Sequence, residues 1–158
     1  MKKGKIMNIK YLMITLCILS LPSMQLLGVS RADKSLRAAV KNKDIAAAKQ
    51  AINEGADINT KADFGSTALM DAIMFNNIGM VTLLLDNGVN VNAKDETFNG
   101  GTALIFAAAN GHVEIAKLLL NKGADITAKD NSGRTVLRAA VGGGNPELVK
   151  LLLAKGAK

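Results

Sequence analysis

The hydrophobic positions of this chain form short helical patterns that come in pairs. In the clearest pair, Leu104, Ala107 and Ala108 are spaced i, i+3, i+4, which predicts a helix over residues 103–109 with one apolar face. A second helix is predicted over residues 113–121, and its inward side chains are Val113, Ile115, Ala116, Leu119 and Leu120. One such pair forms a helix-turn-helix unit.

Each second helix ends at a glycine, and these glycines recur at a fixed period. They are Gly55, Gly88, Gly123 and Gly156, which lie 33, 35 and 33 residues apart. A glycine at this place ends a helix in the left-handed conformation, where a side chain would be strained. A period of about 33 residues is typical of stacked helix-turn-helix units, which become stable when about three are present. We therefore expect an all-α solenoid with short β-turn fingers, whose four units span residues 33–64, 65–99, 100–132 and 133–158.

Polar residues stand where the predicted helices begin. Gly100-Gly101 forms a tight turn before Thr102, whose hydroxyl can accept a hydrogen bond from the first turn of its helix, worth about 1 kcal/mol. The second helices open at Asp44, Asn77, His112 and Asn145. All of these except the histidine are favourable N-caps. Asp125 lies in the turn after a second helix, which its carboxylate can cap.

The first thirty residues carry a different pattern. Residues 1–10 hold four lysines and no acid, residues 11–21 form an apolar run, and small residues surround Ser30. This order of basic, apolar and small residues is typical of a secretory signal peptide. We expect a signal peptide over residues 1–30, cleaved after Ser30 or alternatively after Ala32, and an exported domain over residues 31–158 that is periplasmic or secreted.

The alternative for this leader is an uncleaved anchor in the inner membrane. Residues 11–29 carry no charge and approach the ~20 residues that span a bilayer. Pro22 and the polar residues around it argue against a stable span. Lipid attachment at Cys17 is disfavoured because the bulky Leu16 precedes it.

Composition and charge exclude several classes of function. The net charge is +7, but the leader holds four of the lysines, and from Arg31 onward 16 basic side chains face 13 acidic ones in an interspersed order. Nucleic-acid binders concentrate basic charge on one face, so we expect no nucleic-acid partner. One cysteine and one histidine provide neither a disulfide framework nor a zinc site.

The sequence also offers no catalytic constellation. His112 has no serine or cysteine partner, as a general base with a nucleophile would require. The triplet at residues 142–144 is glycine-rich but lacks the lysine and hydroxyl residue of a phosphate-binding loop, so we interpret it as a flexible turn between helices. We therefore expect no enzyme activity, no catalytic or metal residues, no cofactor and no small-molecule substrate.

Three recurring motifs identify a family. A threonine-led turn recurs as Thr-Ala-Leu-Met at 67–70, Thr-Ala-Leu-Ile at 102–105 and Thr-Val-Leu-Arg at 135–138. Residues 111–115 read Gly-His-Val-Glu-Ile, and residues 119–125 hold the Leu-Leu-x-x-Gly-Ala-Asp segment. With these motifs the chain resembles ankyrin-repeat proteins over about 125 of its 158 residues, and with its leader it resembles a small exported bacterial member.

Departures from the family pattern have a structural interpretation. Unit one has Lys34 in place of the threonine and Gln50-Ala51-Ile52 in place of the leucine triplet, as an N-terminal cap would. Unit four ends in a lysine-rich segment made polar by Lys150, Lys155 and Lys158, as a C-terminal cap would. Two extra residues around positions 95–99 predict a lengthened finger between units two and three.

The resemblance implies that a protein partner binds the finger tips and the exposed face of the first helices. The candidate partner-binding residues are Asp63, Phe64, Ser66, Met74, Phe75, Lys94, Phe98, Asn99, Asn110, Lys129, Asn131, Arg134 and Arg138. Aromatic side chains are favoured interface anchors. The alternative is that Phe64 and Phe98 fold back onto the neighbouring finger while Phe75 fills a gap between first helices. Phe106 is predicted to lie in the core, and the methionines at 70, 74 and 80 are predicted to serve packing rather than metal binding.

The function that follows is that of a non-catalytic interaction module, exported and binding through its concave finger and first-helix surface. The alternative is a protective or assembly factor for another exported enzyme or envelope protein. Both require a protein partner, and neither requires chemistry by this chain.

Overall fold

The computed structural model describes residues 30–61, 65–96 and 99–158. The predicted signal peptide or membrane anchor therefore lies outside the described residues, apart from Ser30. Residues Arg31–Lys158 form one compact unit, and in the part that is described no helix is long and apolar enough to cross a membrane.

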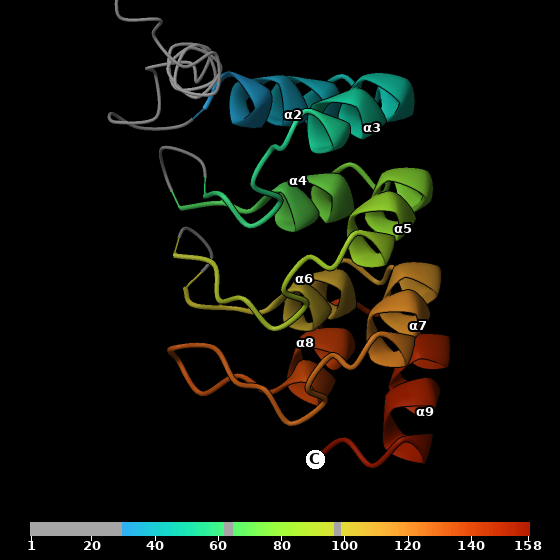
Figure 1. Ribbon diagram of the computed structural model, residues 1–158. Helices are drawn as coiled ribbons and strands as arrows, with labels where there is room; N and C mark the ends of the chain where they lie inside the picture. Colours follow the sequence, from blue (N-terminus) through green and yellow to red (C-terminus); the bar gives the residue numbers. More distant parts are fainter. Residues whose placement is uncertain (1–29, 62–64, 97–98) are drawn as a thin grey trace, which may run out of the picture. The chain divides into compact units, whose positions relative to one another are not determined.

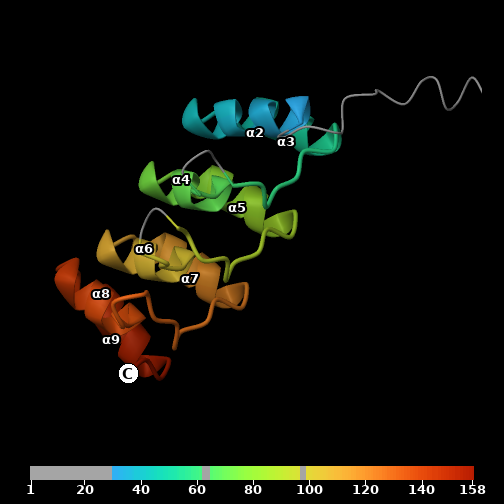
Figure 2. The ribbon, with the colours of Figure 1, turned by 90° about the vertical axis from the view of Figure 1, so that its left-hand side faces the viewer.

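Eight helices of the described residues form four antiparallel pairs. The pairs are α2 (Arg31–Lys41) with α3 (Ile45–Asn53), α4 (Ala68–Met74) with α5 (Ile78–Asp86), α6 (Ala103–Ala109) with α7 (Val113–Asn121), and α8 (Val136–Gly142) with α9 (Pro146–Ala154). Figure 1 shows the first helices stacked in one layer, the second helices in a second layer, and the fingers extending from the first layer. The view in Figure 2 shows the same order from unit one to unit four. The predicted all-α stack of four helix-turn-helix units is confirmed.

The core of the stack is built from the residues that the helical spacing places inward. Leu104, Ala107 and Ala108 are fully buried in α6, and Leu119 is fully buried in α7. Alanine also recurs at one position of the first helices, where Ala72, Ala107 and Ala140 are all fully buried. A small side chain there lets consecutive helices pack closely, as α6 does against both α4 and α8. Two residues predicted to face inward, Val113 and Leu120, are only half-buried, because they lie at the edge of the apolar face of α7.

The predicted caps of the second helices are confirmed. Asp44, Asn77 and Asn145 each accept a hydrogen bond from a first-turn amide, at 2.9 Å from Ala47 N, 3.0 Å from Met80 N and 3.1 Å from Leu148 N. His112, the position without a favourable cap residue, makes no side-chain cap bond.

The prediction for Thr102 is wrong. Its equivalents Thr67 and Thr135 accept at 3.2 Å from the amides of Met70 and Arg138, but the buried hydroxyl of Thr102 has no hydrogen-bond partner among the described residues. The backbone of Thr102 is extended, as it is at Thr135, so the difference lies in the orientation of the hydroxyl and not in the path of the chain.

Side chains in the turns after the second helices connect neighbouring units. Asp125 caps its own turn, accepting at 2.8 Å from Thr127 N, as predicted. The amide of Asp125 in turn donates to the Asn92 side chain of the preceding unit at 2.8 Å, and Asn90 N donates to Asn59 at 2.7 Å. Each turn is therefore held by the unit before it, which makes adjacent units cooperative.

The outward face of unit four is more apolar than its lysines suggest. Lys150, Lys155 and Lys158 are exposed, as the predicted cap requires. Val141 is nevertheless 61% exposed, although the equivalent residues of the two preceding units, Ile73 and Ala108, are fully buried against the next unit. The polar cap is thus only partial on the described face of this unit.

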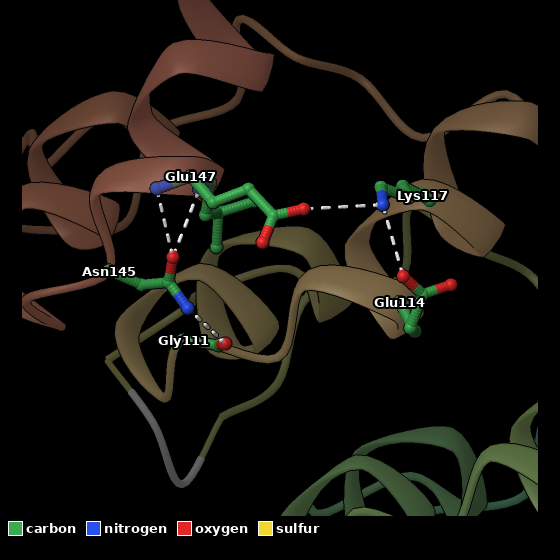
Figure 3. Close-up of polar contacts among 6 residues, drawn as sticks. Gly111, Glu114, Lys117, Asn145 and Glu147 are labelled. Atoms are coloured by element: carbon green, nitrogen blue, oxygen red, sulfur yellow. Dashed lines mark hydrogen bonds and ion pairs between the residues drawn. The ribbon is translucent and has the colours of Figure 1, made fainter.

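Asn145 joins two units through one side chain. Its Oδ1 accepts from the amides of Glu147 and Leu148, both at 3.1 Å, and its Nδ2 donates to Gly111 O at 3.1 Å in the preceding unit (Figure 3). Beside it, the half-buried Lys117 has its ammonium 3.0 Å from the exposed Glu114 and 3.5 Å from the exposed Glu147. The amide is therefore a capping group and a contact between units at once.

Asn145→Ala is expected to lower the free energy of unfolding by about 1–2 kcal/mol, because it removes a helix cap together with a contact between units. Glu147→Gln is a control from the same helix end, and it weakens only an exposed ion pair worth about 0.5 kcal/mol or less. Chemical denaturation followed by circular dichroism measures both variants. Equal losses would mean that the cap contributes no more than the ion pair.

Candidate partner-binding surface

A lysine and a threonine close each finger at its base. Antiparallel bridges join Lys61 to Thr67 in finger two, Lys94 to Thr102 in finger three and Lys129 to Thr135 in finger four, and each threonine is also the N-cap of the first helix of the unit with that number. Because the lysine stands at the same place in each finger, an exposed basic side chain recurs along the edge of the stack. The lysines at the bases of successive fingers therefore form a row of positively charged side chains.

Finger four is organised around a buried carboxylate. Asp130 Oδ1 accepts from Ser132 N and Arg134 N, both at 2.9 Å, and its Oδ2 accepts from Arg134 Nε at 3.0 Å. The Asp130 side chain is only 1% exposed. Burial alone raises the pKa of Asp130, but the amides of Arg134 and Ser132 and the guanidinium hold that pKa below its ordinary value. The carboxylate therefore fixes both the finger and the direction of the arginine.

Asp130→Asn is expected to flatten the acid branch of the stability curve. Since the pKa of Asp130 is lower in the folded protein than in the unfolded chain, its contribution is present above the ordinary value of 3.8 and is lost as the pH falls through the folded pKa. Asparagine cannot titrate and turns an N–H toward the guanidinium. The variant should be less stable than the wild type near neutral pH. Denaturation midpoints measured across acidic pH should show this difference in stability shrinking below about pH 3.8. A difference in stability that stays constant across this pH range would contradict this account.

Two adjoining hollows lie between the fingers and the first helices. The first has a volume of about 360 Å³ and is lined by Met70, Asn99, Gly101, Ile105, Phe106, Ala109 and Arg134. The second has a volume of about 400 Å³ and is lined by Asn99, Asp130, Ser132, Arg134 and Arg138. Because Asn99 and Arg134 line both, the hollows form one continuous depression across units two to four.

The chemistry of this depression changes along the stack. Met70, Ile105 and Arg138 occupy the same position of α4, α6 and α8, the third residue of each helix. The floor of the depression is therefore apolar in units two and three and basic in unit four. Such a surface can hold an apolar group at one end and an anionic group at the other.

Several candidate residues come together at this depression. Asn99, Arg134 and Arg138 line it, and Asn131 N donates to Asn99 O at 2.8 Å beside it. Asn99 also donates from Nδ2 to Ser132 Oγ at 2.6 Å, which links fingers three and four.

Other candidate residues lie apart from the depression. Ser66 donates to Asp71 at 2.5 Å and Asn110 donates to Phe106 O at 2.8 Å, so both side chains form hydrogen bonds within their own units. Lys94 and Lys129 are exposed at the finger bases. The candidates that lie outside the described residues are Asp63, Phe64 and Phe98.

The end of α4 presents two large exposed side chains. Phe75 is 38% exposed and carries the ammonium of Lys43 at 5.7 Å from its ring centroid. Met74 is 46% exposed and does not pack in the interior, whereas Met70 and Met80 are buried. The reason is that Met74 is the last residue of α4, beyond the face that packs against the neighbouring helices.

Sequence reasoning missed most of the apolar floor and part of the polar rim. Phe106 was assigned to the core and Met70 to packing, yet Phe106 is only half-buried and both line the depression. Ile105, Asp130 and Ser132 were not candidates at all. An alignment of the first helices would have identified Ile105, because it occupies the same third position as the candidate Arg138.

The described residues contain no group of three histidine, cysteine, aspartate or glutamate side chains that could hold a metal ion. The half-buried His112 has its pKa lowered by burial, which favours the neutral ring.

Comparison with protein families matches the family described as "Ankyrin repeats (3 copies)", over residues 36–130 and 94–158. The comparison with curated proteins finds no match. The two overlapping matches extend from α2 to the last residue, and they agree with the paired helices of all four units. Ankyrin repeats are a non-catalytic family whose members generally bind other proteins. This chain belongs to the ankyrin-repeat family.

Proposed function

We propose that this chain is an exported interaction module that binds a protein partner through its fingers and first helices. The observation that carries the proposal is the continuous depression across units two to four, which combines an apolar floor with exposed basic side chains. Pockets of this mixed character are typical of binding sites. Met74 and Phe75 extend the same side of the stack with exposed apolar area.

On the second-helix side several exposed charges are paired with one another. There the Lys117 ammonium lies against Glu114 and Glu147, and Lys122 lies 2.9 Å from Asp86. Exposed charges that neutralise one another have little left to offer a partner. We place the proposed partner on the finger side because the depression lies there.

Export rests on the leader sequence alone. The basic, apolar and small-residue segments of residues 1–30 support a cleaved signal peptide of bacterial type. Cleavage after Ser30 would leave helix α2, which begins at Arg31, whole. Mass spectrometry of the protein made from the full chain should give a mature N-terminus at Arg31. An intact leader in the membrane fraction would favour the anchor instead.

Site-directed photo-crosslinking in the native host tests the binding surface. A photoreactive phenylalanine derivative replaces Phe75 or Arg138 on the finger side, or Lys49 or Lys150 on exposed positions of α3 and α9. We expect the first two positions to yield the same crosslinked protein and the last two to yield none. Crosslinks of equal strength from both sides, or from α3 and α9 alone, would contradict the proposed surface.

A further inference from the structure

Exposed basic side chains recur along the finger side of the stack. The fingers and first helices of units two to four carry exposed basic side chains, namely Lys61, Lys94, Lys129, Arg134 and Arg138. The acids described on the same segments are already occupied or buried: Asp95 and Asp130 are buried, Glu96 lies 2.6 Å from Lys61, and Asp71 accepts from Ser66. On the second helices the exposed carboxylates of Asp86, Glu114 and Glu147 each lie beside a lysine of the same face.

Part of the positive charge on the finger side has no carboxylate partner among the described residues. In the part of the chain that the structure describes, Lys94, Lys129 and Arg138 form no ion pair. Arg134 gives only its Nε to Asp130, and that bond holds the guanidinium at the boundary between the two hollows. A guanidinium that lines a depression is suited to binding a carboxylate.

The side chains along the depression give it an apolar end and a basic end. The almost fully buried side chains of Met70 and Ile105, each 1% exposed, give the depression an apolar base, while the exposed Arg138, at the same helix position one unit further on, makes it basic. An occupant must therefore present an apolar side chain and an acidic side chain a short distance apart. An extended peptide segment meets this requirement because neighbouring side chains can reach both hollows.

We propose that the surface recognises an acidic, extended protein segment, which places an apolar side chain between Met70, Ile105 and Ala109 and a side-chain carboxylate on Arg134 and Arg138. This inference rests on the proposed function and specifies the chemistry of the partner. The lysine row at the finger bases attracts further carboxylates of the same segment. Complementary charge of this kind chiefly sets the association rate and the choice of partner.

A nucleic acid is the competing polyanion, and the observations favour a protein. Single-stranded nucleic acids are bound through aromatic platforms on which the bases stack, combined with a basic groove. Here the only described aromatic side chain of the depression, Phe106, is half-buried, and the rest of the floor is aliphatic. An aliphatic floor suits a leucine-like side chain better than a base.

Selection from displayed random peptides tests the inference without knowledge of the partner. The purified full chain, detergent-solubilised if the leader is retained, is the target, and enriched peptides are resynthesised with an amidated C-terminus so that only side chains carry negative charge. We expect the enriched peptides to combine glutamate or aspartate with a large aliphatic residue. Fluorescence anisotropy should give dissociation constants that rise steeply with salt.

A pair of matched charge reversals locates the binding. Arg138→Glu should weaken the selected peptides at least about tenfold, the size of one lost charged contact. Lys150→Glu makes the same change in charge on α9 of the same unit and should leave affinity unchanged. Both positions are exposed, and thermal unfolding of each variant checks that it remains folded.

Three outcomes would overturn the inference: enrichment of neutral or basic peptides, failure to enrich any peptide, and equal effects of the two reversals. A single-stranded oligonucleotide that binds the chain and displaces the peptides would also overturn it, in favour of a general polyanion site. The photo-crosslinking experiment is independent of all these outcomes. A protein crosslinked from positions 75 and 138 would leave the proposed function standing even where its acidic specificity fails.

Discussion

Leu119→Ala is expected to lower the free energy of unfolding by about 3 kcal/mol, within the ~2–5 kcal/mol typical of such truncations. Leu119 is fully buried in α7, which packs against α5 on one side and α9 on the other. Truncation removes apolar contact and leaves a cavity that two neighbouring units line. Relaxation is limited because both neighbours are held in place by their own caps and turns.

Leu153→Ala is the matched control, since it makes the same truncation at a leucine that is 53% exposed in α9. Its expected loss is below about 1 kcal/mol, because most of the side chain already contacts water. Circular dichroism during chemical denaturation gives both values. If Leu119→Ala lost no more than Leu153→Ala, the inward face assigned to α7 would be incorrect.

The position of Leu119 in the stack adds a second expectation. Each unit of a solenoid contacts only its neighbours, so a lesion in unit three weakens the interfaces to units two and four together. The denaturation curve of Leu119→Ala should therefore broaden as well as shift. A shift without broadening would mean that the whole unit from α2 to α9 still unfolds in one step.

The helices of this fold could be predicted from the sequence because each is specified locally. The residue bounds predicted for α6 and α7 agree with the structure, since a cap residue or glycine stands at each end and the apolar spacing fills the interval. Gly123, for instance, has the φ of +85° that a left-handed helix end requires. Such features depend on a few neighbouring residues and not on the rest of the fold.

The depression could be predicted only in part, because it is assembled across units. Asn99 and Arg134 lie in different fingers, and only the stacking of units brings them to the same two hollows. The unpaired basic side chains of the finger side are likewise not apparent along the chain, where acids and bases are interspersed. Prediction also failed for one local detail: the position of Thr102 before its helix was predicted correctly, but the orientation of its hydroxyl group was not.

Gly143→Ala is expected to lower the free energy of unfolding by about 2–3 kcal/mol, the upper range for overpacking a close contact. The glycines at 142–144 were interpreted as a flexible turn, but each has a distinct conformation. Gly143 has a helical φ of −73°, so backbone freedom is not the reason for a glycine there. A methyl group at this position would lie 2.6 Å from the carbonyl oxygen of Ala109 and 2.7 Å from that of Ala108. These are backbone atoms at the end of α6, which cannot avoid the methyl group by changing rotamer.

Gly142→Ala provides a control one residue away with the opposite expected sign. Gly142 is the last residue of α8, and a methyl group there would meet no atom within 4 Å. Alanine favours the helix over glycine, so this variant should be more stable by about 0.5 kcal/mol. The contact of Gly143 with α6 belongs to the α6–α8 packing that also forms the floor of the depression. Gly143→Ala should therefore weaken selected peptides as well as stability, whereas Gly142→Ala should leave their affinity unchanged, and stabilisation by both alanines would show that α6 and α8 are less closely packed than described.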